Sequence, residues 1–145
     1  MKSIKNAYLR IALTALLSSG MAYSRADAQR VNVSADFTAP DDVGKQIASK
    51  IRQKIALSPL MTFISSEKTT SLRLKLVTLN PDDGSSQNQT VYSKVLVFHP
   101  DSGGLDLYLS SSVGTCGRNK VDQCAETIFA DIDEWADAIR KNPAK

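Results

Sequence analysis

The sequence has few of the residues that build most catalytic and metal sites. It contains one histidine, one tryptophan and two cysteines in 145 residues. A structural zinc site usually needs four ligands, and this set is too small for one. The sequence also lacks a Gly-x-Ser-x-Gly motif, a glycine-rich phosphate loop, a cluster of metal ligands and an internal repeat. We therefore expect no metal and no cofactor.

A hydrophobic run long enough to cross a membrane is also missing. Residues 11–22 form an uncharged segment rich in leucine and alanine, about twelve residues long, whereas a span of ~30 Å of hydrocarbon takes roughly 20. Basic residues precede this segment, and Ala26-Asp27-Ala28 follows it. A positive start, a short apolar run and a small-x-small site are typical of a secretory signal peptide.

We accordingly predict that residues 1–28 are a signal peptide, cleaved after Ala28, and that residues 29–145 form a single domain. The short positive segment and the Ala-x-Ala site fit a Gram-negative bacterium, so the predicted location is the periplasm, with passage outside the cell left open. No cysteine lies near the cleavage site to carry a lipid. We expect no stable membrane insertion after cleavage.

An excess of charge of one sign disappears with that segment. The chain has 18 Lys and Arg and 15 Asp and Glu, a net charge of +3. Residues 1–28 hold four of the basic residues and one of the acidic residues, so 14 of each remain in residues 29–145. A neutral domain gives no argument for nucleic-acid binding. An envelope or extracellular protein is the expected kind of partner, and the oligomeric state stays open.

The two cysteines, Cys116 and Cys124, are separated by seven residues. A thioredoxin-type redox pair has two residues between its cysteines. Because the periplasm is oxidising, we predict a structural disulfide that ties the end of a strand to the start of a helix. Arg118, Asn119 and Lys120 would then lie at the tip of a pinned polar loop, which is either a binding surface or a solvated turn.

Two segments have the 3.6-residue period of amphipathic helices. The apolar stripe of residues 41–58 consists of Val43, Ile47, Ala48, Ile51 and Ile55. The stripe of residues 121–141 consists of Val121, Cys124, Ala125, Ile128, Phe129, Ile132, Trp135, Ala136 and Ile139. The outer face of the first helix is basic and that of the second is acidic. Thr38, three residues before Asp41, predicts a capping box at the first helix start.

Five segments are predicted strands: residues 31–37, 60–65, 71–79, 90–98 and 105–110. In the last of them, Leu105, Leu107 and Leu109 are expected to face the core. Short connections favour an antiparallel meander of the last four strands. The predicted order is β-α-β-β-β-β-α, an α+β fold in which two helices cover one face of a mainly antiparallel sheet as a two-layer sandwich.

The uncovered face of such a sheet is a candidate binding surface. Depending on the strand register, it would carry basic and aromatic side chains from three strands: Arg73, Lys75, Tyr92, Lys94 and Tyr108. An ordinary solvated sheet face has the same alternation.

The histidine, His99, ends a predicted strand within Phe-His-Pro-Asp-Ser-Gly-Gly. Asp101 and Ser102 are close in sequence, but a catalytic triad needs three groups that converge in a cleft. Proline and paired glycines are turn residues on their own account. We predict a structural turn and no catalytic residue.

Two stretches resemble known exported proteins. The segment DDVGKQIASKIRQKIALSPLMTFISS resembles the amino-terminal domain of the Tol-Pal translocation protein TolB and curli-secretion-type lipoproteins. The segments VYSKVLVF, SSSVGTCG and CAETIFADID are similar to small uncharacterised exported proteins of Gram-negative bacteria. These resemblances imply an envelope location and bring no functional residue.

The sequence thus favours an exported, non-enzymatic binding or envelope-assembly accessory domain. The alternative is a small envelope hydrolase or an enzyme inhibitor that presents residues 117–120. A structural subunit of an envelope assembly is a third hypothesis, and it predicts self-association.

Overall fold

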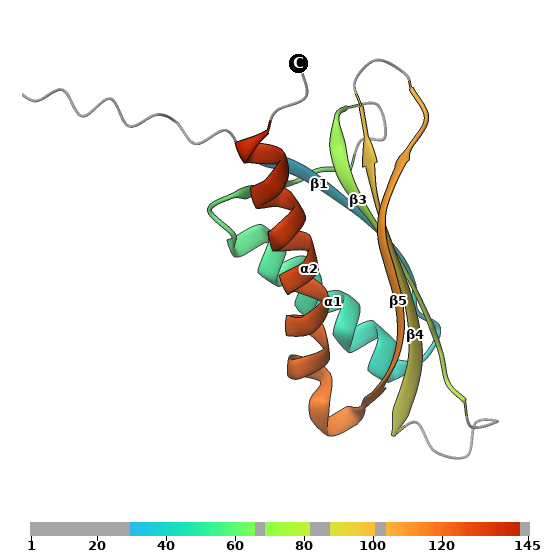
Figure 1. Ribbon diagram of the computed structural model, residues 1–145. Helices are drawn as coiled ribbons and strands as arrows, with labels where there is room; N and C mark the ends of the chain where they lie inside the picture. Colours follow the sequence, from blue (N-terminus) through green and yellow to red (C-terminus); the bar gives the residue numbers. More distant parts are fainter. Residues whose placement is uncertain (1–29, 66–68, 82–87, 101–103, 143–145) are drawn as a thin grey trace, which may run out of the picture.

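The computed structural model describes residues 30–65, 69–81, 88–100 and 104–142 (Figure 1). Its elements are β1 (Val31–Thr38), α1 (Asp42–Leu57), β2 (Met61–Phe63), β3 (Ser71–Leu79), β4 (Gln89–His99), β5 (Leu107–Gly117), the 3-10 turn η1 (Arg118–Lys120) and α2 (Val121–Lys141). The α+β class and the predicted order of elements are confirmed. The predicted signal peptide lies outside the described residues. Within the described ranges, no helix combines the length and the hydropathy needed to span a bilayer.

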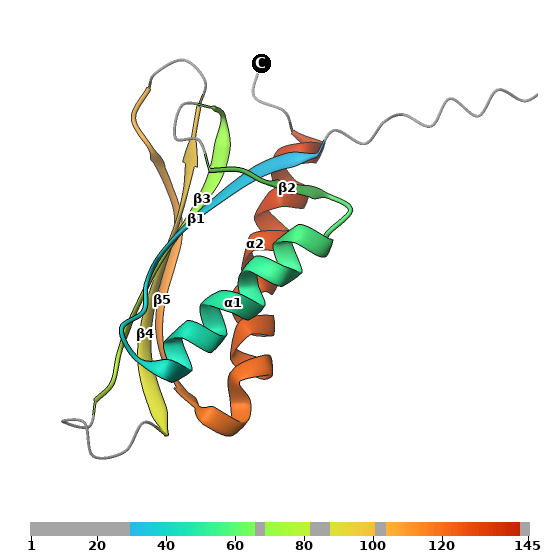
Figure 2. The same ribbon diagram turned by 180° about the vertical axis from the view of Figure 1, so that it is seen from behind.

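Both helices lie on the same side of the sheet, so the domain has two layers (Figures 1 and 2). The core between the layers contains the predicted stripe of α1, and Val43, Ile47, Ile51 and Ile55 are all fully buried. The stripe of α2 contributes Val121, Ala125, Ile128, Ile132 and Ala136. The sheet contributes leucines of its central strands, namely Leu72, Leu74, Leu76 and Leu96. Helix periodicity alone therefore identified the helical half of the core.

The sheet is mixed, with the strand order β2-β1-β3-β4-β5. Strand β1 runs parallel to both β2 and β3, whereas β3, β4 and β5 are antiparallel neighbours. The predicted meander is correct for β3–β5 and wrong for β2, because β1 lies between β2 and β3. Helix α1 carries the chain back along the sheet after β1, and such a crossover joins parallel strands.

Strand β5 differs most from its prediction. It covers Leu107–Gly117 rather than residues 105–110, and the register shifts between Leu96 and Val97. Leu109 packs against the core, but Leu105 is 89% exposed and Leu107 is 56% exposed. The prediction that all three leucines face inward is wrong. The irregularity interrupts the alternation on which it rested, and Leu105 lies before the strand begins.

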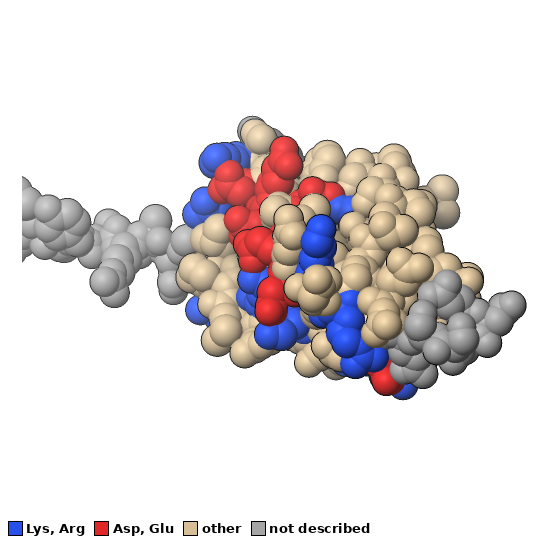
Figure 3. Space-filling model, turned by 90° about the horizontal axis from the view of Figure 1, so that it is seen from below, with Lys and Arg blue, Asp and Glu red and all other residues tan. Residues whose placement is uncertain are grey.

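The two helices contact each other through their oppositely charged faces. Lys50 on α1 pairs with Asp122 on α2 at 2.8 Å, and Lys54 pairs with Glu126. Figure 3 shows blue and red side chains side by side over the helices, while the sheet side of this view is mostly tan. Exposed pairs of this kind contribute only about 0–1 kcal/mol each, so they orient the helices more than they stabilise the fold.

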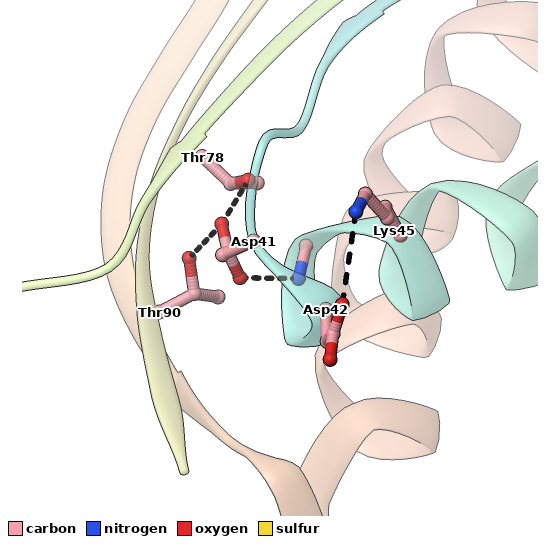
Figure 4. A network of polar contacts seen from close by, with 6 residues as sticks. Asp41, Asp42, Lys45, Thr78 and Thr90 are labelled. Carbon is pink, nitrogen blue, oxygen red and sulfur yellow. Dashed lines mark hydrogen bonds and ion pairs between the residues drawn. The ribbon is translucent and has the colours of Figure 1, made fainter. Parts of the chain in front are cut away.

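A buried carboxylate joins the start of α1 to the sheet (Figure 4). Asp41 is the N-cap, and its Oδ1 accepts a hydrogen bond from the Gly44 N–H at 2.7 Å. Its Oδ2 accepts hydrogen bonds from the hydroxyls of Thr78 at 2.6 Å and Thr90 at 3.1 Å. The predicted capping box at Thr38 is wrong, because β1 continues through Thr38 and the cap falls on Asp41.

The partners of Asp41 explain its ionisation. Burial raises the pKa of this carboxyl, but the hydrogen bonds from Thr78, the Gly44 N–H and Thr90 outweigh burial and hold the pKa below its ordinary value. Both carboxylate oxygens are satisfied, so this group is a structural clamp between α1, β3 and β4.

Candidate functional site

The side of the sheet turned away from both helices is the candidate site, and we call it the open face. The register determines its side chains, because residues directly opposite each other in neighbouring strands share a face. On β3–β5 the open face carries Arg73, Lys75, Val77, Leu79, Val91, Ser93, Val95, Val97, His99, Tyr108, Ser111, Val113 and Thr115.

One end of the open face is apolar. Val77 is 50% exposed, Leu79 is 63% exposed and Val113 is 74% exposed. Leu79 lies opposite Val91, and Ser93 lies between Val77 and Val113, so these side chains form a contiguous patch. Exposed apolar patches of this kind commonly mark interaction sites.

The other end of the open face holds an ionic cluster. His99 Nδ1 lies 2.8 Å from Asp106 Oδ1, and an Arg73 guanidinium nitrogen lies 3.7 Å from the same oxygen. Arg73 Nε also donates to the Ser71 hydroxyl at 3.4 Å. The carboxylate of Asp106 therefore links the end of β4 to β3, just before β5 begins.

The hydrogen bond with His99 lowers the pKa of Asp106 the most. Desolvation opposes it, and the electrostatic interactions with Arg73, His99 and Lys75 lower the pKa further. Asp106 stays ionised as the acidic member of a basic cluster. Asp106 was not among the predicted site residues, because it lies seven residues from His99 and meets it only when the chain returns at the start of β5.

Three of the predicted surface residues come together on the open face. Arg73 and Lys75 lie on β3, and Tyr108 lies across Val97 from Arg73. The Tyr108 hydroxyl lies 3.0 Å from the Ser111 hydroxyl. The exposed apolar residues were not among the predicted site residues. The signal was present in the sequence, because Val77 and Leu79 alternate with the inward-facing Leu72, Leu74 and Leu76.

Tyr92 and Lys94 are not on the open face, which corrects the expected grouping. Lys94 lies opposite the core residue Leu76, and Tyr92 lies opposite the buried Thr78. Both therefore point toward the helices. The Lys94 side chain is 5% exposed and pairs with Asp131 of α2, and burial lowers the pKa of this ammonium. The counter-ion on α2 explains why a lysine is found beneath the helices.

The predicted polar loop, Arg118–Lys120, forms η1. The disulfide between Cys116 and Cys124 is confirmed, with 6.2 Å between the two Cα atoms, and it joins the end of β5 to α2. Arg118 donates its N–H to the Asn88 carbonyl at 2.7 Å. Asn119 and Lys120 are exposed. This turn follows the last residues of β5, at the opposite end of that strand from Tyr108.

The catalytic alternative depends on His99, which ends β4 as predicted. Asp101 and Ser102 lie outside the described residues. Ser71 is the serine directly across from His99, but it is 1% exposed and accepts a hydrogen bond from Arg73. Within the described ranges, no three His, Cys, Asp or Glu side chains are grouped so that they could hold a metal ion.

A second surface feature lies on the helix side. A hollow of about 450 Å³ is lined by the end of α1, the turn after it and α2, with Leu57, Pro59, Leu60 and Phe129 as its apolar lining and Lys54 and Asp133 as its charged residues. Leu57 is 75% exposed beside it. This hollow competes with the open face as a docking place and is useful as a control.

Comparisons with known proteins give little more. No protein-family model matches the chain, and no curated protein sequence matches it. Among solved structures, the chain is similar to a minor lipoprotein from Acinetobacter baumannii, with a TM-score of 0.41 and 11% sequence identity over 70% of this chain and 91% of that chain. The resemblance to TolB stays a prediction.

Proposed function

We propose that this chain is an exported, non-enzymatic binding module of the bacterial envelope that holds a protein partner against its open face. The observation that supports this proposal is the exposed patch of Val77, Leu79 and Val113. The solvated face of an antiparallel sheet ordinarily carries polar residues. Exposure of an apolar patch to water is unfavourable, and a partner that covers the patch removes this cost.

The two ends of the open face suggest what the partner carries. Apolar side chains would cover the patch at Leu79, and polar or charged side chains would meet Arg73 and Asp106. Full burial of a leucine side chain contributes about 1.5–3 kcal/mol, and ~1.4 kcal/mol corresponds to a factor of ten in affinity. Removal of the Leu79 side chain should therefore weaken binding about tenfold or more.

The experiment compares two matched leucines. Leu79 is 63% exposed on the open face, and Leu57 is 75% exposed beside the hollow on the helix side. A photo-crosslinking amino acid replaces the exposed Ser93 in chains that also carry Leu79→Ser or Leu57→Ser, and these chains are crosslinked inside the cells that produce them. We expect one crosslinked protein, lost with Leu79→Ser and kept with Leu57→Ser. A crosslink that survives Leu79→Ser would refute this proposal, and loss with Leu57→Ser would move the site to the hollow.

A small envelope hydrolase remains the second candidate, supported by the hydrogen bond between His99 and Asp106, because a carboxylate orients the histidine of a triad in this way. The burial of Ser71 argues against it. Model esters and peptides test it, and any hydrolysis that His99→Ala abolishes would favour the hydrolase. An inhibitor would instead bind its enzyme through η1, and Lys120→Ala would weaken that complex.

A further inference from the structure

Strand β5 forms one edge of the sheet, and no described strand pairs with its outer side (Figure 1). The strand has 11 residues, whereas the strand at the opposite edge, β2, has only three. Half of the backbone N–H and C=O groups of an edge strand point outward without a ladder partner. The long edge is therefore the one that offers a template for another strand.

Most of this edge, residues 110–117, lacks the usual protection against pairing. Native edge strands carry lysine or proline, or are very short, and these devices prevent association. Residues 110–117 read Ser-Ser-Ser-Val-Gly-Thr-Cys-Gly, with no charge and no proline. A bulge is a further protective device, and the one in β5 lies at Leu109, between Ser110 opposite Leu96 and Tyr108 opposite Val97, so it precedes this segment.

Contacts on the helix side and at one end also hold residues 110–117 in place, so only the outer edge of this segment is without a partner strand among the described residues. A Cβ atom at Gly114 would lie 2.6 Å from the Tyr92 ring, so the ring covers Gly114 from the helix side. The disulfide fixes Cys116 to α2 at the end of the strand. A strand that is already ordered loses little conformational entropy when it pairs.

We propose that a second copy of this chain pairs with β5, as β5 against β5 in an antiparallel arrangement about a two-fold axis. A two-fold antiparallel pairing brings residues at the axis close to their own equivalents and pairs residues on either side of the axis with each other, and like charges directly opposite each other are destabilising. A segment without charge has no such penalty. The contact is closed, because the three residues of β2 are too few to continue the sheet on the other side.

The charges of Lys75 and Asp131 do not oppose the pairing. Lys75 on β3 and its equivalent would be five strand spacings apart, roughly 24 Å at ~4.8 Å per spacing. This separation is well beyond the Debye length of about 8 Å at physiological ionic strength. On the helix side, Asp131 is already paired with Lys94.

The proposed dimer goes beyond the proposed function and does not rest on it. The joined sheet would place the two open faces side by side, with Val113 of each copy next to the seam. An edge contact of eight residues is roughly 27 Å long at ~3.4 Å per residue and only one strand, ~4.8 Å, wide. Such a narrow contact buries less area than a standard interface of ~800 Å² per partner. We therefore expect a dimer that dissociates on dilution.

Sedimentation equilibrium of the purified exported chain over a wide concentration range tests this pairing. Two single variants, Ser112→Lys and Thr115→Lys, each add a lysine to β5 of both copies, so that like charges meet across the seam between the two β5 strands. A control variant, Gln123→Lys, places the same charge on the exposed surface of α2. We expect a reversible monomer–dimer equilibrium. The first two variants should weaken dimerisation about tenfold or more, and the control should leave it unchanged. Circular dichroism shows whether each variant is folded.

Hydrogen exchange of the unaltered protein gives a second readout that needs no variant. The outward-facing amides of residues 110–117 should become protected as the concentration rises, and the amides of β2 should not. A chain that stays monomeric, or a dimer that neither lysine on β5 weakens, would overturn the pairing. If dimerisation is normal but the chain gives no crosslink, or gives one that survives Leu79→Ser, the result counts against the proposed function alone.

Discussion

Replacement of Gly44 by alanine should destabilise the protein, although helices favour alanine. In an unconstrained helix interior, alanine is more favourable than glycine by about 1 kcal/mol. Gly44 lies in the first turn of α1, directly against the sheet. An added Cβ would lie 2.0 Å from Thr78 Oγ1 and 2.8 Å from Asp41 Oδ2. No methyl group fits at these distances, so α1 or β3 has to move.

The size of the effect follows from what that movement breaks. Thr78 donates a 2.6 Å hydrogen bond to the Asp41 carboxylate, and a hydrogen bond to a charged group contributes about 1.5–3 kcal/mol. A weakened N-cap at Asp41 costs ~1 kcal/mol more. The helix preference for alanine offsets about 1 kcal/mol of this. We expect a net loss of roughly 2 kcal/mol in the free energy of unfolding.

Urea unfolding followed by circular dichroism measures this loss. Thr78→Val removes the same hydrogen bond without adding volume, so the loss in the double variant should be smaller than the sum of the two single losses. Ala56→Gly on the exposed end of α1 reports the ordinary helix preference in this protein. A Gly44→Ala variant that is as stable as the unaltered chain, or more stable, would refute the reasoning.

Four further changes should also alter stability. Asp131→Asn should lower the free energy of unfolding by about 2–4 kcal/mol, because it leaves the buried Lys94 ammonium without its counter-ion. Lys94→Met should lower it less, because the carboxylate that it leaves unpaired is 42% exposed. Urea unfolding of both variants compares them, and the reverse ranking would contradict this account. Reduction of Cys116–Cys124 should cost about 2–3 kcal/mol for its short closed loop, measured as a lower urea midpoint with and without dithiothreitol. The pKa of Asp41 is lowered by folding, so its contribution is complete above its unfolded pKa of about 4 and is lost as the pH falls through the lower folded pKa. Acid unfolding should therefore shift to higher pH in Thr90→Val, and an unchanged midpoint would exclude that role.

Much of the fold could be predicted because the pattern of a helix lies within one continuous segment of the sequence. The stripe of Ile47, Ile51 and Ile55 repeats at helical spacing, and such a pattern requires a covering surface on one side only. The disulfide followed from the predicted compartment and the number of cysteines. These features depend on residues that are close in sequence.

The strand neighbours could not be predicted in the same way, because they depend on which segments meet across the sheet. The alternation in Val31 and Val33 shows that β1 has one buried side, but not that β1 lies between β2 and β3. Tyr92 and Lys94 look like surface residues in the sequence. Only the register with β3 shows that they face α2, where Asp131 meets the lysine.

The placement of β1 also explains why the apolar patch lies where it does. On the open face β1 contributes the polar side chains Asn32, Ser34 and Asp36, so the exposed valines are confined to β3–β5, on the half of the sheet next to the free edge. Energetically dominant contacts cluster at the centre of an interface, where surrounding residues exclude water. In a single chain Val113 lies at the rim, on the edge strand itself. Pairing of β5 with its copy would move Val113 to the centre of a joined surface, so the seam and the open face would favour each other. Leu79→Ser should then leave dimerisation intact, whereas Ser112→Lys should weaken partner capture even though it alters no residue of the open face.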